Sequence, residues 1–175
     1  AQKYNGLVGT GPLGSIYGSP VATFHLSKAY NATIQNQKVS GVMTALVRAE
    51  EVTAALQAAV GNSGALGLVY EVDTGRVVAT SWKQSVADYT AFDPQSNTPT
   101  ITLPSIGTIS SQPQMRQALD ELGGMAVLTQ AAMPDDGVSM LTSQGWVNVR
   151  PVVTGSLQGL KIRVVTFIPL AATTL

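Results

Sequence analysis

The pattern of apolar and polar residues from Val39 to Ser81 predicts a strand, a helix and two further strands in succession. An apolar run, Val39–Val47, reads as a strand and leads into the helical run Arg48–Val60. Within the second run, Val52 and Leu56 recur at the spacing of one helix face, and Ala, Glu and Gln fill most of the other positions. This stretch therefore sets the framework for the rest of the chain.

Turn residues divide the second half of this stretch. Gly61 follows the last apolar position of the helix, where a C-terminal cap is favoured. The apolar runs Ala65–Val72 and Arg76–Ser81 are separated by Asp73–Gly75, which has a glycine for positive φ. The two runs are therefore predicted to form a β-hairpin.

A second hairpin is predicted upstream. Val21–Ala32 reads as a strand that pairs with Val39–Val47 across a polar turn at Gln35–Lys38. Gly41, inside the second strand, predicts a bulge or a close backbone approach. Ala1–Pro20 is rich in Gly and Ser and reads as loop or extended chain.

The amino-acid composition of the chain changes after Ser81. Ala91–Ser111 carries repeated Pro, Ser and Thr and is expected to be a long loop, either a ligand-facing flap or a surface excursion. Gln112–Leu122 has its apolar residues on one face and predicts a helix, with Ser111 as N-cap and Gly123-Gly124 as the stop.

Three further strands are expected toward the C-terminus. Met125–Gln130 is a short apolar run read as a strand, followed by a turn at Pro134–Gly137. Gly145–Val153 and Gly159–Ile168 alternate between apolar and polar positions and are expected to pair. In the last strand the pattern sets the apolar positions Leu160, Ile162 and Val164 against Lys161 and Arg163.

Hairpins alternating with helices indicate an α+β fold with an antiparallel sheet flanked by helices, because a doubly wound parallel sheet would need single strands between helices. At 175 residues the chain is long enough for one domain, or one domain and part of another.

Composition excludes several classes of function. Basic and acidic residues both number 10, so no basic stripe suggests nucleic acid. There is no cysteine, which excludes disulfides, Cys-ligated metals and cysteine nucleophiles. Asn31-Ala32-Thr33 fits the glycosylation acceptor pattern, although such triplets also arise by chance.

No catalytic or metal-binding constellation is visible, and no cofactor is predicted. Gly9–Gly14 matches G-x-G-x-x-G, but no convincing strand precedes it and no helix pattern follows it. His25 is the single histidine and lies in a predicted strand, so a Ser–His–acid triad would have to use it.

A binding pocket for a small carboxylate is easier to assemble from the residues present. Tyr70, Trp146, Arg150 and Arg163 all lie in predicted strands. Arginine supplies a charge-assisted fork for a carboxylate, and Tyr or Trp supplies contact area. The alternatives are that the arginines are solvated strand residues and that the aromatic side chains pack in the core.

Several segments in this order resemble the Cache sensor family. The family's strands and short helix are matched by Ser19-Pro20-Val21, Val39–Val42, Glu51-Val52, Leu56, Leu68–Tyr70 and Asp73–Ala79, and its closing strand pair by Gly145–Pro151 and Leu160–Pro169. The resemblance covers about Ser19 to Leu170. It implies a PAS-like α+β fold and an extracytoplasmic sensing role on chemoreceptors, sensor kinases or cyclases.

The resemblance also implies an organisation. Residues 1–18 would be an N-terminal extended segment, 19–170 the sensor domain (either one module or parts of two, 19–60 and 61–170), and 171–175 a tail leading to a membrane segment. A complete receptor would be anchored in a membrane with this domain outside the cytoplasm. It would bind an unknown small molecule and could form a homodimer.

The chain departs from the family at one informative position. Many amino-acid-binding members carry an Asp after the second strand, and the aligned residue here is Leu46. The amino-acid-binding signature is therefore not supported. A ligand-free interaction module and an enzyme with a site around His25 remain as alternatives, and a His25→Ala variant would test the enzyme.

Overall fold

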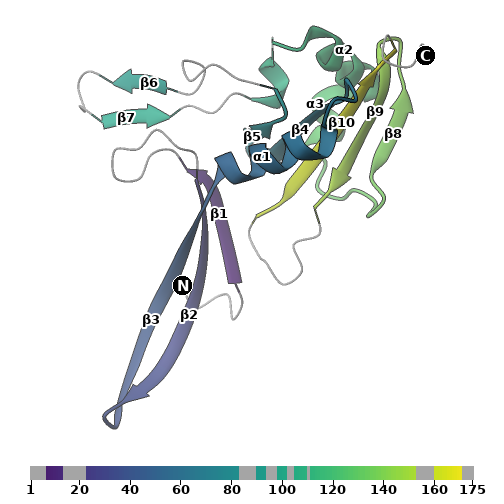
Figure 1. Cartoon of the computed structure of the whole chain (residues 1–175). Coiled ribbons are helices and arrows are strands. Elements are labelled where there is room, and N and C mark those ends of the chain that lie inside the picture. The colour runs from purple at the N-terminus through teal and green to yellow at the C-terminus, as the bar shows by residue number, and fades with distance from the viewer. Residues whose placement is uncertain are drawn as a thin grey trace.

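The computed structural model describes residues 7–13, 23–82, 90–93, 98–101, 105–109, 111–152 and 160–170. These residues form a five-stranded sheet with helices on both faces, a three-stranded sheet that projects from it, and a small two-stranded hairpin (Figure 1). In the part of the chain so described, no helix is both long and apolar enough to cross a membrane.

The five-stranded sheet is antiparallel throughout and has the order β5-β4-β10-β9-β8. Its strands are β4 (Leu66–Glu71), β5 (Val77–Thr80), β8 (Val138–Leu141), β9 (Gly145–Pro151) and β10 (Ile162–Pro169). The last strand in sequence is central, between β4 and β9. This arrangement confirms the α+β fold class predicted from the alternation of hairpins and helices.

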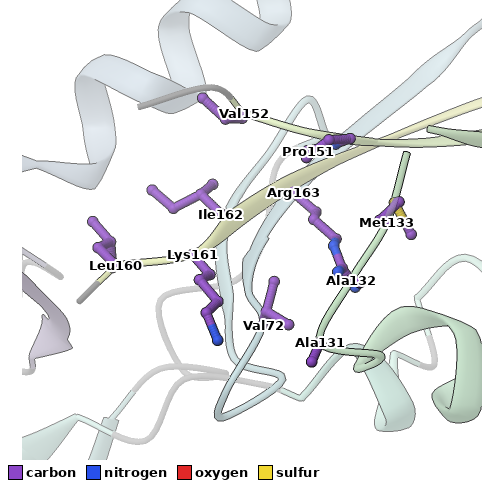
Figure 2. Close-up of a pocket in the computed structure, with 10 residues that line it drawn as sticks. All are labelled: Val72, Ala131, Ala132, Met133, Pro151, Val152, Leu160, Lys161, Ile162 and Arg163. Atoms are coloured by element: carbon purple, nitrogen blue, oxygen red, sulfur yellow. The ribbon is translucent and has the colours of Figure 1, made fainter. Parts of the chain in front are cut away.

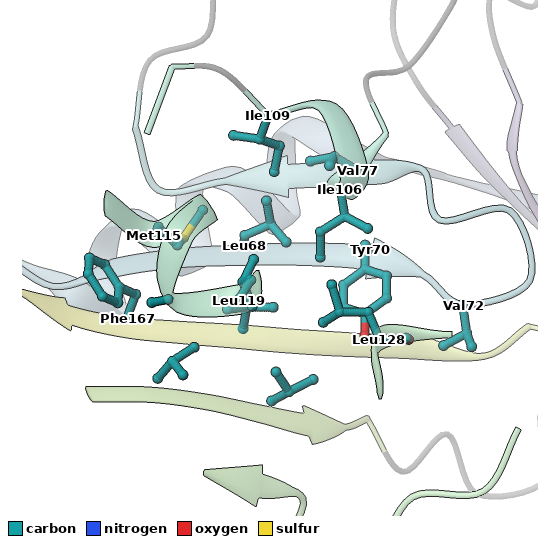
Figure 3. Close-up of a cluster of buried hydrophobic side chains, with 14 residues drawn as sticks. Leu68, Tyr70, Val72, Val77, Ile106, Ile109, Met115, Leu119, Leu128 and Phe167 are labelled. Atoms are coloured by element: carbon teal, nitrogen blue, oxygen red, sulfur yellow. Dashed lines mark hydrogen bonds between the residues drawn. The ribbon is translucent and has the colours of Figure 1, made fainter. Parts of the chain in front are cut away.

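Helices cover the two faces of this sheet differently. Helix α1 (Ala49–Val60) packs on β4 and β5 from one side. On the other side lie η2 (Ile106–Thr108), α2 (Pro113–Leu122) and α3 (Gly124–Leu128). The larger core is on this second side, between the sheet and α2 (Figure 3).

The two cores follow from the alternation along the central strands. Residues of β4, β9 and β10 that point to the α2 side are fully buried, and include Leu68, Val147, Val149, Val165 and Phe167. Val69 and Val164 point to the opposite side and pack with Val52 and Leu56 of α1. Successive residues of each central strand therefore face the two cores alternately, as strand geometry requires.

The three-stranded sheet is built from β1 (Leu7–Leu13), β2 (Thr23–Ile34) and β3 (Gln37–Arg48), in that order. The predicted hairpin is confirmed, but its turn is shorter than expected. Only Gln35 and Asn36 form it, with φ values of 49° and 65°. Two consecutive positive φ angles give the tight two-residue turn that matches the twist of paired strands.

Gly41 makes room for a cross-strand side chain, and neither the bulge nor the close backbone approach that the sequence suggested is found. A Cβ placed there would lie 2.7 Å from the ring and hydroxyl of Tyr30, its cross-strand partner. The register of β2 with β3 continues without a bulge through this point. His25 lies in β2 as predicted, with its backbone paired to Thr10 and Leu46. The Gly9–Gly14 motif falls largely in β1.

The expectation of a single long loop over Ala91–Ser111 is wrong where the chain is described. Residues Thr90–Asp93 (β6) and Thr98–Ile101 (β7) pair as a short hairpin, and η2 follows. Ser105 also forms an isolated bridge with Arg76. The frequent prolines exclude a long helix but allow short strands, because Pro99 sits in a two-stranded ribbon whose outer edges need no partner.

The prediction of a strand at Met125–Gln130 is also wrong, because the segment forms helix α3 and the start of the loop after it. Gly123, with φ of 126°, ends α2 and lets the chain begin another helix at once. A short apolar run cannot be assigned by periodicity alone. The third C-terminal strand is instead β8, which the sequence pattern did not indicate.

The N-cap of α2 differs from the prediction. Gln112 rather than Ser111 occupies that position, and its side chain makes no capping hydrogen bond. Pro113 stands at the first turn, where the missing N–H costs nothing. The predicted N-terminal extended segment lies outside the described residues except for 7–13, which form β1, and the predicted tail, 171–175, lies outside them entirely.

Candidate functional site

Arg163 is a buried cation on the side of the sheet that carries the larger core. Only 3% of its surface is exposed. The sequence pattern had set Arg163 against the apolar residues of its strand, but both faces of β10 are covered, so the side opposite Ile162 and Val164 is also buried. The side chain leaves the sheet toward the loop that follows α3 (Figure 2).

Backbone carbonyls surround the Arg163 guanidinium. Nη1 donates to the carbonyl oxygen of Leu128 at 2.6 Å and, over 3.5 Å, to that of Val127. Nη2 donates to the carbonyl oxygen of Gln130 at 2.6 Å. These oxygens belong to the C-terminal end of α3 and the residues after it, where unpaired carbonyls favour a positive charge.

No carboxylate balances Arg163 within the described ranges. The ion pairs found there join Arg116 to Asp120 and Lys161 to Asp73. A buried cation is ordinarily paired with an anion, because carbonyl dipoles compensate only part of the cost of removing it from water. The position is therefore suited to a negatively charged group from outside the chain.

Tyr70 lies directly opposite Arg163 in the sheet, on β4. Its hydroxyl donates to the same Leu128 carbonyl oxygen at 2.8 Å, and its ring is fully buried (Figure 3). Burial raises the pKa of the Tyr70 hydroxyl, and the nearby Arg163 partly offsets that rise. The structure thus brings Tyr70 and Arg163 together around one backbone carbonyl.

A pocket of about 360 Å³ opens next to Arg163. Its wall comes from β10 and the residues before it, the end of β9, and the loop after α3, as Figure 2 shows. The lining residues are Val72, Ala131, Ala132, Met133, Pro151, Val152, Leu160, Lys161, Ile162 and Arg163. This volume is at the small end of the range for ligand sites in proteins.

Lys161 supplies a second positive charge at the pocket. Its Nζ lies 3.5 Å from Oδ1 of Asp73, and the Lys161 side chain is 57% exposed. Exposed pairs of this kind contribute little to stability and exchange readily with other partners. The pocket therefore has one buried and one exposed cation among largely apolar walls.

The structure separates Trp146 and Arg150 from Tyr70 and Arg163. Both lie on β9 and point to the α1 side of the sheet, opposite to Val147 and Val149. Arg150 is exposed, and Trp146 is 36% exposed. A role for these two residues in binding a small molecule stays a prediction.

Sequence reasoning missed Lys161 and the loop residues Ala131 to Met133. The signal for Lys161 was present, because it stands two positions before Arg163 and so points to the same side of the strand. The loop contributes small side chains and backbone carbonyls, which no side-chain pattern could indicate.

The fold matches solved extracytoplasmic sensor domains. The ligand-binding domain of the Pseudomonas aeruginosa PAO1 amino-acid chemoreceptor PctC, solved with GABA, is 14% identical, with a TM-score of 0.50 over 94% of this chain. The extracellular domain of a protein described as a histidine kinase is 17% identical, with a TM-score of 0.51 over 99% of this chain.

These likenesses concern the fold. This chain spans 56% of the chemoreceptor domain and 57% of the kinase domain, so it corresponds to a little more than half of each. No family model matches the chain, and no characterised protein matches it in sequence. The α+β fold expected from the resemblance to Cache domains is confirmed at the level of structure.

Proposed function

We propose that this chain is an extracytoplasmic sensor domain of a membrane receptor, and that it binds a small molecule carrying a carboxylate in the pocket at Arg163. The observation that carries the proposal is Arg163 itself, a buried cation at a pocket wall with no carboxylate partner in the described residues. The fold shared with chemoreceptor and kinase domains supports the sensing role.

The chemistry of the pocket favours an anion of a few heavy atoms. Arginine binds carboxylates through two parallel N–H···O bonds, which are about twice as strong as neutral hydrogen bonds. Lys161 adds a charge at the mouth, and the alanines and Met133 leave room for a short apolar body. The GABA bound by the structural neighbour is itself a small carboxylate.

Binding would change the loop after α3. A ligand carboxylate competes with the Gln130 carbonyl for Nη2 of Arg163, because the charged acceptor forms the stronger bond. Releasing Gln130 frees the chain that leads to β8, so the ligand favours one of two positions of that segment. A ligand acts on such an equilibrium only through different affinities for the two states.

A thermal-shift screen against amino acids, small carboxylates, polyamines, purines and sugars tests this function. Ligand at a hundred times its dissociation constant adds about 2.7 kcal/mol to the free energy of unfolding. We expect the carboxylate classes to raise the melting temperature of the wild-type protein. An Ala132→Trp variant, which fills the pocket, is expected to lose the shift.

Ala58→Trp is the matched control, because Ala58 is exposed on α1 and does not line the pocket. It should respond like the wild type. The proposal fails if no class gives a shift at millimolar concentration, or if Ala132→Trp responds as strongly as Ala58→Trp.

A further inference from the structure

An apolar groove lies beside helix α1, on the side of the sheet opposite to the core at α2. It has a volume of about 340 Å³. Helix α1 packs mainly over β4 and β5, so the next strand, β10, is only partly covered on this side. A Cβ added to Gly67 of β4 would lie 3.3 Å from a methyl carbon of Leu56. The helix is therefore packed closely on β4, and the groove remains between the helix and β10.

Every side chain that lines this groove is apolar. The lining residues are Val52, Ala55, Leu56, Val69, Val152, Ile162 and Val164. Their side chains offer neither a hydrogen-bond donor nor a charge, so a polar group placed among them would lose its bonds to water without replacement. The groove is therefore suited to a hydrocarbon part of a ligand.

The groove and the Arg163 pocket meet at two residues. Val152 and Ile162 line both cavities. The backbone amide of Val152 donates to the carbonyl oxygen of Ile162 at 2.9 Å, so the two residues are cross-strand neighbours at the beginning of β10. The Val152 side chain is partly open to solvent, with 40% of the residue exposed. A ligand that extends from the pocket past these two side chains therefore reaches the groove.

Consecutive residues of β10 give the two cavities different chemistry. Figure 2 shows the side chains of Ile162 and Arg163 leaving the strand in different directions. The Arg163 guanidinium reaches the backbone carbonyl oxygens at the end of α3, whereas Ile162 packs with the core on the α1 side. Positive charge and purely apolar walls are thus presented by neighbouring positions of one strand, which is the arrangement that suits an amphiphilic ligand.

We propose that the ligand is a straight-chain alkyl carboxylic acid, whose carboxylate pairs with Arg163 and whose hydrocarbon tail lies in the groove beside α1. This inference rests on the proposed function, because it takes the Arg163 pocket as the carboxylate site. The pocket holds the charged end and the first carbons of the ligand, with Lys161 at its mouth. The remaining carbons pass Val152 and Ile162 and cover the apolar walls of the groove.

The hydrophobic effect favours one amphiphile over a short acid. Each methylene group that the groove removes from water tightens binding about fourfold. Acetate leaves the groove in contact with water and gains nothing from it. An amino acid of the same length as the alkyl acid would bring its ammonium group against walls that have no acceptor for it. The two cavities together therefore select an unsubstituted tail.

Calorimetric titration of the 175-residue chain with acetate, butanoate, hexanoate and octanoate tests the inference. We expect one-to-one binding and an affinity that rises about fourfold for each methylene group that enters the groove. Octanamide has the same tail without the charge and should bind about tenfold more weakly than octanoate. Hexanoate with a terminal amino group should bind more weakly than hexanoate, because the groove does not pair an ammonium group.

Ala55→Phe fills the groove and is expected to remove the dependence on chain length. Ala55 is exposed on α1 and lines the groove, so a larger side chain there leaves both cores intact. Octanoate should bind this variant no more tightly than butanoate does, whereas butanoate should bind it as it binds the wild type. Ala54→Phe is the matched control, because Ala54 is the preceding residue, is also exposed and does not line the groove.

Two results would overturn the inference while leaving the carboxylate site in place. One is a wild-type affinity that is the same for all four acids. The other is an equal dependence on chain length in Ala55→Phe and Ala54→Phe, because the tail would then lie elsewhere. Equal affinity for octanoate and octanamide, or no binding of any of the acids, would overturn both the inference and the proposed carboxylate site.

Discussion

At the scale of single residues, the Leu128 carbonyl is the point where β4, β10 and α3 meet. It accepts from both Tyr70 and Arg163, at 2.8 and 2.6 Å. The sequence placed each of these two residues in a predicted strand and made both candidates for a binding site, but it did not indicate that their strands pair. It could not indicate the shared acceptor, because backbone carbonyls at the end of an unpredicted helix leave no side-chain signal.

Removing Arg163 should destabilise the protein much more than removing the Tyr70 hydroxyl. Arg163→Met leaves buried carbonyls without donors and is expected to cost about 3 kcal/mol of unfolding free energy. Tyr70→Phe leaves Leu128 with its Arg163 bond, so the expected cost is about 1 kcal/mol. Urea denaturation measures both values, and equal losses would contradict the shared-acceptor arrangement.

Alkaline pH should unfold the protein partly through Tyr70. Burial raises the pKa of its hydroxyl above 10.0, the ordinary value that the unfolded chain keeps. The unfolded state therefore loses this proton first. Stability is fully present below pH 10 and falls as pH rises from there through the folded pKa.

The measurement is the free energy of unfolding between pH 8 and 11, compared with Tyr70→Phe, which lacks the ionisable group. The wild type should lose more stability than the variant over this interval. Parallel curves would show that Tyr70 ionises equally easily in the folded and unfolded states.

At the scale of elements, the sequence predicted the long periodic segments well and the short ones poorly. The hairpin β2–β3, helix α1, the pair β4–β5, helix α2 and the pair β9–β10 are confirmed within a few residues. α3 and β8 were missed because each has five residues or fewer, too few for a period to emerge.

The burial of Arg163 could not be predicted from its strand alone. Alternation in β10 separated Arg163 from the apolar residues correctly, but which face is buried depends on helices that pack from both sides. That information lies in tertiary packing, so a strand with charged residues on one side reads as half exposed. The loop from Gln130 to Met133 completes the pocket only because α3 ends where it does.

Glycine is required at the entrance to β8. Gly137 has φ of 79°, and a Cβ there would lie 2.2 Å from the Val149 carbonyl oxygen, a backbone atom that cannot move freely. Gly137→Ala is expected to cost about 3 kcal/mol or more, from backbone strain and from displacement of β8 from β9.

Gly61→Ala is the matched control for this prediction. Gly61 also has positive φ, 50°, but its nearest atom to an added Cβ is 4.0 Å away. Only the conformational cost of about 1 kcal/mol is expected there. Thermal or urea unfolding compares the two variants, and similar losses would show that the contact with β9 does not matter.

At the scale of the whole molecule, the fold is similar to that of a chemoreceptor ligand-binding domain and a kinase extracellular domain, and the Arg163 pocket is where we propose that a ligand binds. The pocket joins the central strand β10 to the loop that leads from α3 to β8. A ligand bound there contacts the middle of the sheet and a segment at its edge. Under the proposal, binding changes the position of the segment between α3 and β8 relative to the sheet.

The most direct test is a calorimetric titration with the best carboxylate from the thermal-shift screen and with its primary amide, which has nearly the same shape but no charge. We predict that the amide binds at least tenfold more weakly, a difference of about 1.4 kcal/mol. We also predict that Lys161→Met weakens carboxylate binding several-fold while changing the free energy of unfolding by under about 0.5 kcal/mol. Equal affinity for acid and amide would contradict a site built around a buried arginine.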